Sequence, residues 1–101
     1  MADSGEGHPA SPSAAVDRLA TFREELRLVS RDPAQNRDRF YTLRWQPSLF
    51  GEPALVRTWG RVGTVGRSRA SVYPDATRAQ AAIVALLRRR LRHGYRVVAW
   101  R

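Results

Sequence analysis

The sequence predicts an α+β domain in which one amphipathic helix packs across one face of an antiparallel sheet of four to five strands. Two observations carry this prediction. Between Arg23 and Val72, apolar and polar residues alternate in short runs separated by turn residues, which is typical of a strand meander. From Thr77 onward, apolar residues recur at helical spacing instead.

Composition separates the first 21 residues from the rest of the chain. Residues 1–14 are mainly Gly, Ser, Pro and Ala with two acids, so they have nothing to bury. Residues 15–22 are a transition that can form a helical turn. We therefore expect residues 1–21 to be a disordered or weakly structured N-terminal tail, and residues 22–101 to fold as a single domain.

The predicted strands are bounded by residues that favour turns. The first strand alternates Leu26 and Leu28 with Arg27 and ends at Asp32-Pro33. A glycine-rich turn at residues 63–66 separates the third strand from the fourth. After the strand around Leu26, the expected strands cover residues 39–45, 53–62 and 67–72, with a last short strand at 95–100.

The predicted helix begins at a capping box, because Gln80 stands three residues after Thr77, and Gly94 provides a stop signal. Its apolar face comprises Ala79, Ile83, Leu86, Leu87 and Leu91. Its opposite face carries Arg78, Arg88, Arg89 and Arg92. Arg90 is the exception: it falls toward the apolar side, where it must extend its guanidinium to solvent or find an acceptor.

Positive charge is concentrated in the predicted domain. The chain has 18 basic residues, all of them arginine, against nine acids, which gives a net charge of +9. Residues 22–101 carry 17 arginines against six acids, whereas residues 1–21 have a net charge of −2. Coding bias explains the absence of lysine but not this segregation. Because a guanidinium group matches phosphate oxygens and stacks on rings, we expect the folded part to bind a polyanion.

Several classes of chemistry lack the residues that they need. The chain has no cysteine, which excludes disulfides, zinc–thiolate sites and cysteine nucleophiles. His8 and His93 have no second ligand at metal spacing, and neither the serines nor the acids form a catalytic pattern. We therefore expect no enzyme activity, metal, cofactor or small-molecule substrate. With no signal peptide and no long apolar run, we also expect a cytoplasmic location and no membrane partner.

Alternation along residues 55–61 places Arg57, Trp59 and Arg61 on one strand face. A basic–aromatic–basic stripe suits a backbone phosphate beside a stacked ring. For Trp59 and for the arginines, a structural role remains an alternative to ligand binding. Trp59 could be a core side chain beneath the helix. Arg61 could pair with an acid such as Glu52 or Asp75, or be solvated.

Two further groups of arginines are candidate phosphate contacts. Arg67 and Arg69 follow the glycine turn, whose backbone amides can form a small anion nest, although such a turn is more often a plain hairpin. Arg88, Arg89, Arg90 and Arg92 gather near the end of the helix, where they also complement the helix dipole and keep the surface hydrated.

With the strands placed, the chain resembles the WGR domain, a family found in poly(ADP-ribose) polymerases and in small bacterial proteins. The family is named for the tripeptide that Trp59-Gly60-Arg61 forms here, and the likeness covers residues 25–97. Its elements are, in order, Asn36, Arg39-Phe40-Tyr41 with Leu43, Gly51, the run from Arg57 to Gly66, Arg90 and Gly94-Tyr95. Arg67 stands where the family often has glutamine, and Arg90 where lysine is usual. Both departures keep or add positive charge.

The resemblance implies a non-catalytic nucleic-acid-binding module, with DNA favoured over RNA and a bacterial DNA-repair context. In the polymerases the domain helps to grip DNA ends and breaks. There the motif tryptophan packs against the sugar–phosphate of a terminal nucleotide, and the motif arginine makes DNA or interdomain contacts. These roles fall on Trp59 and Arg61 here, with Gly60 between them. The alternative is a protein-interaction or regulatory adaptor that docks an acidic partner protein through the same surface.

Overall fold

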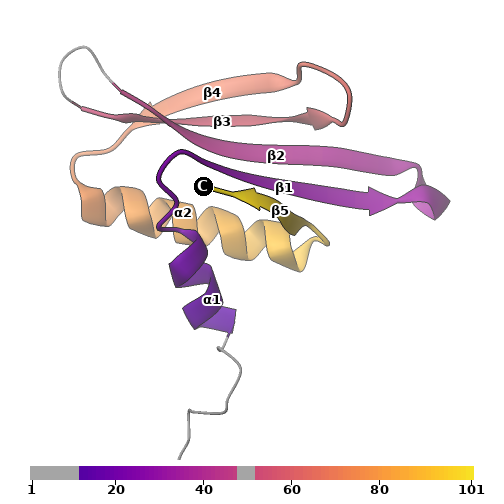
Figure 1. Cartoon of the computed structure of the whole chain (residues 1–101), viewed down its shortest axis with the longest axis horizontal. Coiled ribbons are helices and arrows are strands. Elements are labelled where there is room, and N and C mark those ends of the chain that lie inside the picture. Colours follow the sequence, from indigo (N-terminus) through magenta and orange to yellow (C-terminus); the bar gives the residue numbers. More distant parts are fainter. Residues whose placement is uncertain (1–11, 48–51) are drawn as a thin grey trace, which may run out of the picture.

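The chain forms a five-stranded antiparallel sheet with one long helix across it, which confirms the predicted α+β class (Figure 1). The structure is a computed structural model and describes residues 12–47 and 52–101. Gly51 and residues 1–11 of the expected tail therefore lie outside the described residues. The strands are β1 (Glu25–Asp32), β2 (Arg37–Gln46), β3 (Ala54–Arg61), β4 (Arg67–Val72) and β5 (Arg96–Trp100). The helices are α1 (Pro12–Leu19), α2 (Ala76–Arg92) and a short 3-10 helix, η1 (Pro33–Gln35), between β1 and β2.

The strand order is β4-β3-β2-β1-β5, and every pair is antiparallel. Strands β1 to β4 form the predicted meander, and α2 then carries the chain back so that β5 pairs with β1. The register aligns Leu28 with Tyr41, Tyr41 with Trp59 and Trp59 with Arg67. Residues that pair directly share a face of the sheet, so this row runs across four strands on one face.

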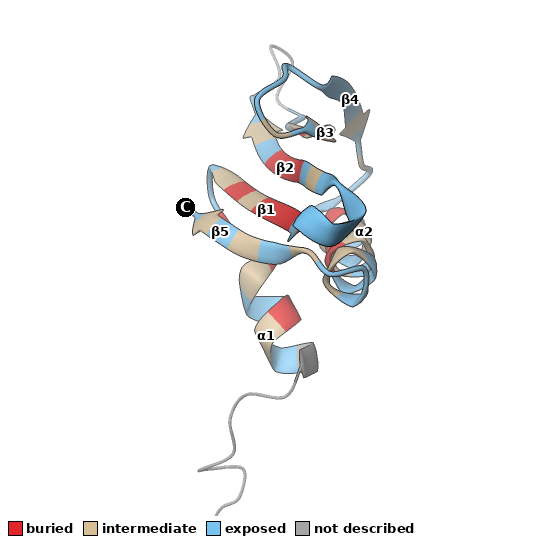
Figure 2. Ribbon diagram, turned by 90° about the vertical axis from the view of Figure 1, so that its right-hand side faces the viewer, coloured by how far each residue is buried: buried red, intermediate tan, exposed pale blue. Residues whose placement is uncertain are grey.

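The core lies between α2 and this face of the sheet, whereas none of the helices in the described residues covers the opposite face (Figure 2). The sheet contributes Leu26, Leu28, Tyr41, Leu43 and Leu55, and α2 contributes Ala79, Ile83 and Leu87. Leu86 and Leu91 are partly buried against the same cluster. The predicted apolar face of the helix is therefore confirmed, and the arginines of its other face are exposed.

Helix α2 begins two residues earlier than the capping box predicts. Its N-cap is Asp75, whose Oδ1 accepts a hydrogen bond from the backbone N–H of Arg78 at 2.8 Å, so the prediction of Thr77 as the cap is wrong. Both residue types cap helices. The Asp75 carboxylate also lies 3.9 Å from the side-chain Nε of Arg78, which adds an attraction that a threonine hydroxyl lacks. At the other end, Gly94 has a φ of +85° and follows the helix as predicted.

Helix α1 lies within the segment expected to be a tail. Its Val16 is buried, as are Ala20 and Phe22 in the connection to β1, and all three belong to the core cluster. The indole N–H of Trp100 donates a hydrogen bond to the carbonyl of Leu19 at 3.2 Å. Apolar burial and this hydrogen bond together hold α1 against the end of the sheet and beside α2.

Candidate nucleic-acid interface

Strand β3 points Leu55, Arg57, Trp59 and Arg61 to the same side of the sheet as α2, as alternation predicts. Exposure increases along the strand: Leu55 is fully buried, Arg57 and Trp59 are half-buried, and Arg61 is exposed. Strands β3 and β4 lie at one edge of the sheet, above α2 in Figure 2. The end of β3 therefore presents its inward-facing side chains to solvent.

Strand pairing adds two predicted arginines to the same surface. Arg67 of β4 pairs with Trp59, and Arg69 pairs with Arg57, so both point to the side of the sheet that α2 occupies. We call Arg57, Trp59, Arg61, Arg67 and Arg69 the basic strip. Four guanidinium groups thus surround one tryptophan on two neighbouring strands.

Trp59 has one side on the core and another toward the basic strip. It packs against the buried cluster, and the guanidinium carbon of Arg57 lies 6.0 Å from the centre of its ring. The Nε atom of Arg57 is buried and has no hydrogen-bond partner among the described residues. The core interpretation of Trp59 is therefore correct for part of the indole, and the rest of the side chain remains accessible for stacking.

Arg61 has a partner that the sequence alternatives did not include. Its Nη2 donates to the side-chain oxygen of Asn36 at 3.1 Å, and its Nη1 donates to the backbone carbonyl of Asn36 at 3.3 Å. Asn36 has a φ of +53° and stands in the connection between η1 and β2. Among the described residues, Arg61 does not form the ion pair with Glu52 or Asp75 that was one of the alternatives. A guanidinium carries five N–H donors, so Arg61 anchors this connection and keeps donors for a ligand.

Gly60 and Gly66 let the turn after β3 fold back onto the sheet. A Cβ atom on Gly60 would lie 2.8 Å from the Cα of Gly66. Gly66 itself has a φ of +75°, and a Cβ there would collide with the Trp59 carbonyl and the Phe40 ring. Gly60 is thus explained by packing, and its predicted role in nucleic-acid binding stays a prediction. The contact also fixes where Arg61 and Arg67 stand at the two ends of the turn.

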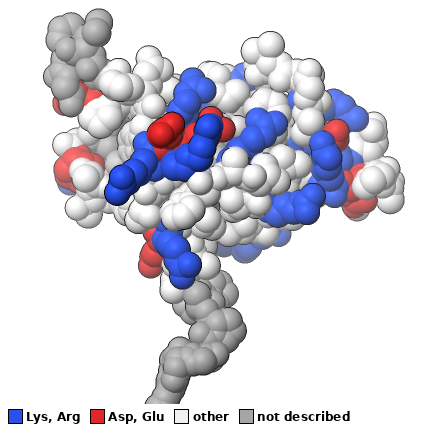
Figure 3. All heavy atoms as spheres, viewed as in Figure 1, with Lys and Arg blue, Asp and Glu red and all other residues white. Residues whose placement is uncertain are grey.

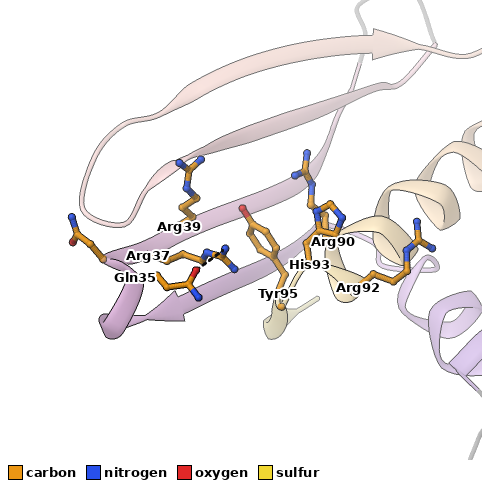
Figure 4. Close-up of a pocket in the computed structure, with 9 residues that line it drawn as sticks. Gln35, Arg37, Arg39, Arg90, Arg92, His93 and Tyr95 are labelled. Atoms are coloured by element: carbon orange, nitrogen blue, oxygen red, sulfur yellow. Dashed lines mark hydrogen bonds between the residues drawn. The ribbon is translucent and has the colours of Figure 1, made fainter.

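A hollow of about 710 Å³ adjoins the basic strip. Its lining residues come from the η1–β2 connection and from the end of α2, and we call this site the basic hollow: Gln35, Asn36, Arg37, Arg39, Arg90, Arg92, His93, Gly94 and Tyr95. Figure 4 shows Tyr95 between Arg39 of β2 and Arg90 of α2. Arg39 pairs with Arg61 across the strands, and Asn36 bonds to Arg61, so strip and hollow form one surface.

On the apolar side of α2, Arg90 packs its guanidinium against aromatic rings, while its buried Nε has no hydrogen-bond partner among the described residues. Its guanidinium carbon lies 4.2 Å from the ring centre of Tyr41 and 5.7 Å from that of Tyr95. Such cation–π contacts offset part of the cost of drawing the charge out of water. The side chain thereby reaches the basic hollow, and it holds Tyr95 at the rim.

The arginines predicted near the end of the helix do not all belong to the hollow. Arg90 and Arg92 line the basic hollow, whereas Arg88 and Arg89 are exposed on α2 and do not line it. The site prediction from residue pattern also missed several residues of the hollow. Three of these, Asn36, Arg39 and Tyr95, belong to the sequence elements shared with the WGR family, so the resemblance could have pointed to them. No pattern in the sequence pointed to Arg37 or His93 as residues of a binding site.

Charge is distributed differently on the two faces of the sheet. On the face opposite α2, acidic side chains lie among the arginines (Figure 3). The ion pairs among the described residues are Arg31–Asp38 at 2.7 Å, Arg101–Glu25 at 3.0 Å and Arg78–Asp75 at 3.9 Å. None of them includes an arginine of the basic strip or the basic hollow. The positive field of this surface is therefore not neutralised by neighbouring carboxylates of the described chain.

The described part of the chain forms neither a metal cluster nor a membrane-spanning helix. Within residues 12–47 and 52–101, no three histidine or acidic side chains gather in a group that could hold a metal ion. None of the helices described in these ranges is long and apolar enough to cross a membrane.

Comparison with known proteins assigns the fold to a family. The model of the WGR domain matches residues 24–99, a span that includes the sheet, α2, the basic strip and the basic hollow. The chain belongs to the WGR domain family. WGR domains are generally nucleic-acid-binding modules of poly(ADP-ribose) polymerase-like proteins, and their role is binding and not catalysis. Helix α1 lies outside the part that the family model matches.

A relative of this WGR domain protein occurs in Sinorhizobium fredii. The chain is 27% identical to the uncharacterized protein y4dW of that organism, over 95% of its own length. It spans about half of the length of that relative, 52%.

Proposed function

We propose that this WGR domain binds DNA through the basic strip and the basic hollow and catalyses no reaction itself. The observation that carries the proposal is the grouping of arginines without carboxylate partners around Trp59 and Tyr95, within the described residues. Phosphate oxygens would take the place of the missing carboxylates, and the forked donors of arginine suit them. The hollow would receive one part of the backbone, and the strip would follow the next phosphates.

The position of Trp59 supports a preference for ends or breaks. Trp59 is half-buried and packs against the core, which favours stacking of its indole on an exposed nucleotide over insertion between two bases. Within a duplex both faces of each base pair are covered by their neighbours. A terminal nucleotide, or one beside a nick, leaves a face or a sugar free for stacking. Recognition of breaks would place the chain in DNA repair.

The test is a fluorescence anisotropy titration of short labelled duplexes with a blunt end or a nick, with closed circular DNA as the unlabelled competitor. We expect Trp59→Ala and Arg61→Ala each to weaken binding about tenfold or more, since stacking and charged contacts are worth roughly 1–3 kcal/mol. Arg96→Ala is the matched control, because Arg96 is exposed and pairs with Val29 on the opposite face of the sheet.

The outcomes separate the proposal from its alternative. Binding that is undetectable at low salt, or that is equally weakened by Arg96→Ala, would contradict DNA binding at this surface. Equal competition by circular DNA would contradict the preference for ends. An adaptor that docks an acidic protein through the same arginines predicts a protein complex that survives nuclease treatment and excess competitor DNA.

A further inference from the structure

The molecule has a second hollow at the end away from the basic hollow. It measures about 480 Å³ and is lined by Trp45, Glu52, Pro53, Tyr73, Pro74, Asp75, Ala76, Ala79 and Gln80, and we call it the Trp45 groove. Strand β2 begins at the basic hollow and ends at this groove, and α2 runs in the opposite sense between the same two sites. From Arg39 to Trp45 the separation along β2 is roughly 20 Å at about 3.3 Å per residue.

The side chains that line the Trp45 groove include aromatic rings and proline rings. Trp45 and Tyr73 are half-buried, and Pro53 and Pro74 are exposed beside them. The ring of Trp45 stacks on the ring of Phe22: the ring centres lie 6.0 Å apart and the planes are 21° from parallel. Aromatic rings held in this way receive the proline rings of an extended peptide, which is already ordered in the polyproline II conformation before it binds.

The charged side chains that line the Trp45 groove are acidic. Glu52 and Asp75 line it and no arginine does, in a chain whose net charge is +9. Asp75 caps α2, so its carboxylate already satisfies the positive end of the helix. Glu52 is exposed and forms no ion pair with any described residue. A ligand of this groove would therefore carry a cation to Glu52 and would avoid acids.

We propose that the Trp45 groove binds a proline-containing peptide segment that carries an arginine or lysine, contributed by a partner protein. The proline rings lie on Trp45 and Tyr73, and the basic side chain reaches Glu52. Because this site and the basic hollow stand at opposite ends of β2 and α2, both are occupied at the same time. The proposal does not depend on DNA binding, and it differs from an adaptor that uses the basic surface for an acidic partner.

The experiment uses the full chain and a short fluorescein-labelled peptide that repeats Pro-Pro-Arg, followed by anisotropy. Two peptides of the same length serve as comparison probes, one repeating Gly-Ser-Arg and one repeating Pro-Pro-Glu. The variants are Tyr73→Ser, which removes one ring wall, and Glu52→Arg, which reverses the free charge. Asp17→Arg is the matched control, because Asp17 is an exposed acid on α1 outside the groove. Circular dichroism and urea unfolding establish that each variant is folded.

We expect saturable binding of the Pro-Pro-Arg probe alone. Its affinity falls at least about tenfold in Tyr73→Ser and severalfold in Glu52→Arg, and it is unchanged in Asp17→Arg. Binding of the Gly-Ser-Arg probe with the same affinity would overturn the role of proline, and equal binding of the Pro-Pro-Glu probe would overturn the role of Glu52. If the natural chain binds no Pro-Pro-Arg probe, the proposal fails.

Discussion

Single residues of the basic strip make structural contacts and also expose groups to solvent. Arg61 bonds to both oxygens of Asn36, and Trp59 packs on the core with one side while the other faces the arginines of the strip. The sequence placed Arg57, Trp59 and Arg61 on one face, because alternation along a strand is a local property. It did not predict Asn36 as the partner of Arg61, because the two residues meet only when β2 and β3 pair.

At this scale the two glycines of the β3–β4 turn give a sharp prediction. Gly66→Ala should lower the free energy of unfolding by at least about 2 kcal/mol, because the residue has a positive φ and its Cβ would meet the Trp59 carbonyl. Gly63→Ala is the control: its φ is +92°, but a Cβ there meets no atom within 4 Å, so only the conformational cost of about 1–2 kcal/mol applies. Urea unfolding measures the free energy of unfolding of both variants. A larger decrease for Gly63→Ala than for Gly66→Ala would contradict the packing argument.

The secondary-structure elements follow the sequence closely where the pattern is periodic. The strand expected over residues 67–72 is β4 as observed, and the one expected at 53–62 is β3 over Ala54–Arg61. Helix α2 was predicted from its apolar face, but its start was not, because Asp75 and Thr77 are both capping residues and only the observed hydrogen bond decides between them. Helix α1 has too few apolar residues for a periodic signal, and its burial depends on Trp100 and the core at the far end of the chain.

The packing of α1 can be measured with one substitution and its neighbour. Val16→Ala should lower the free energy of unfolding by about 1–2 kcal/mol, because it removes buried apolar atoms from a side chain that is only 4% exposed. Asp17→Ala, on the exposed side of the same helix turn, should change it by less than about 0.5 kcal/mol. Equal effects would mean that α1 is not part of the cooperative fold. Hydrogen exchange at the backbone amides of residues 16–20 provides an independent measure.

The whole molecule brings together residues that no local pattern connects. Arg39 and Tyr95 line one hollow although most of the chain separates them, because α2 crosses the sheet and returns the chain beside β1. The net charge of the folded part was evident from the sequence, but its distribution over the two faces was not. That distribution depends on which arginines find acids, such as Arg31 with Asp38, and pairing of this kind is decided by tertiary contacts.

This distribution predicts how DNA binding responds to salt. The logarithm of the affinity should fall linearly with the logarithm of salt concentration, with a slope of about −4 if four or five phosphates of duplex DNA are neutralised. Arg39→Ala with Arg67→Ala should reduce the size of the slope by about 2, because both arginines face the ligand without carboxylate partners. Arg31→Ala with Arg96→Ala removes the same charge from the opposite face and should leave the slope unchanged. An equal reduction of the slope in the two double variants would show that net charge alone governs DNA binding.

The close approach of Gly60 to Gly66 has a consequence for how such domains are recognised. The middle letter of the Trp-Gly-Arg tripeptide is required by the backbone packing of a hairpin, and no ligand is needed to explain it. A descendant that lost its arginines and its ligand would still be under selection to keep this glycine and the one after the turn. The presence of Gly60 therefore indicates common descent and a hairpin of this shape. The arginines around the tripeptide indicate whether the surface still binds its ligand.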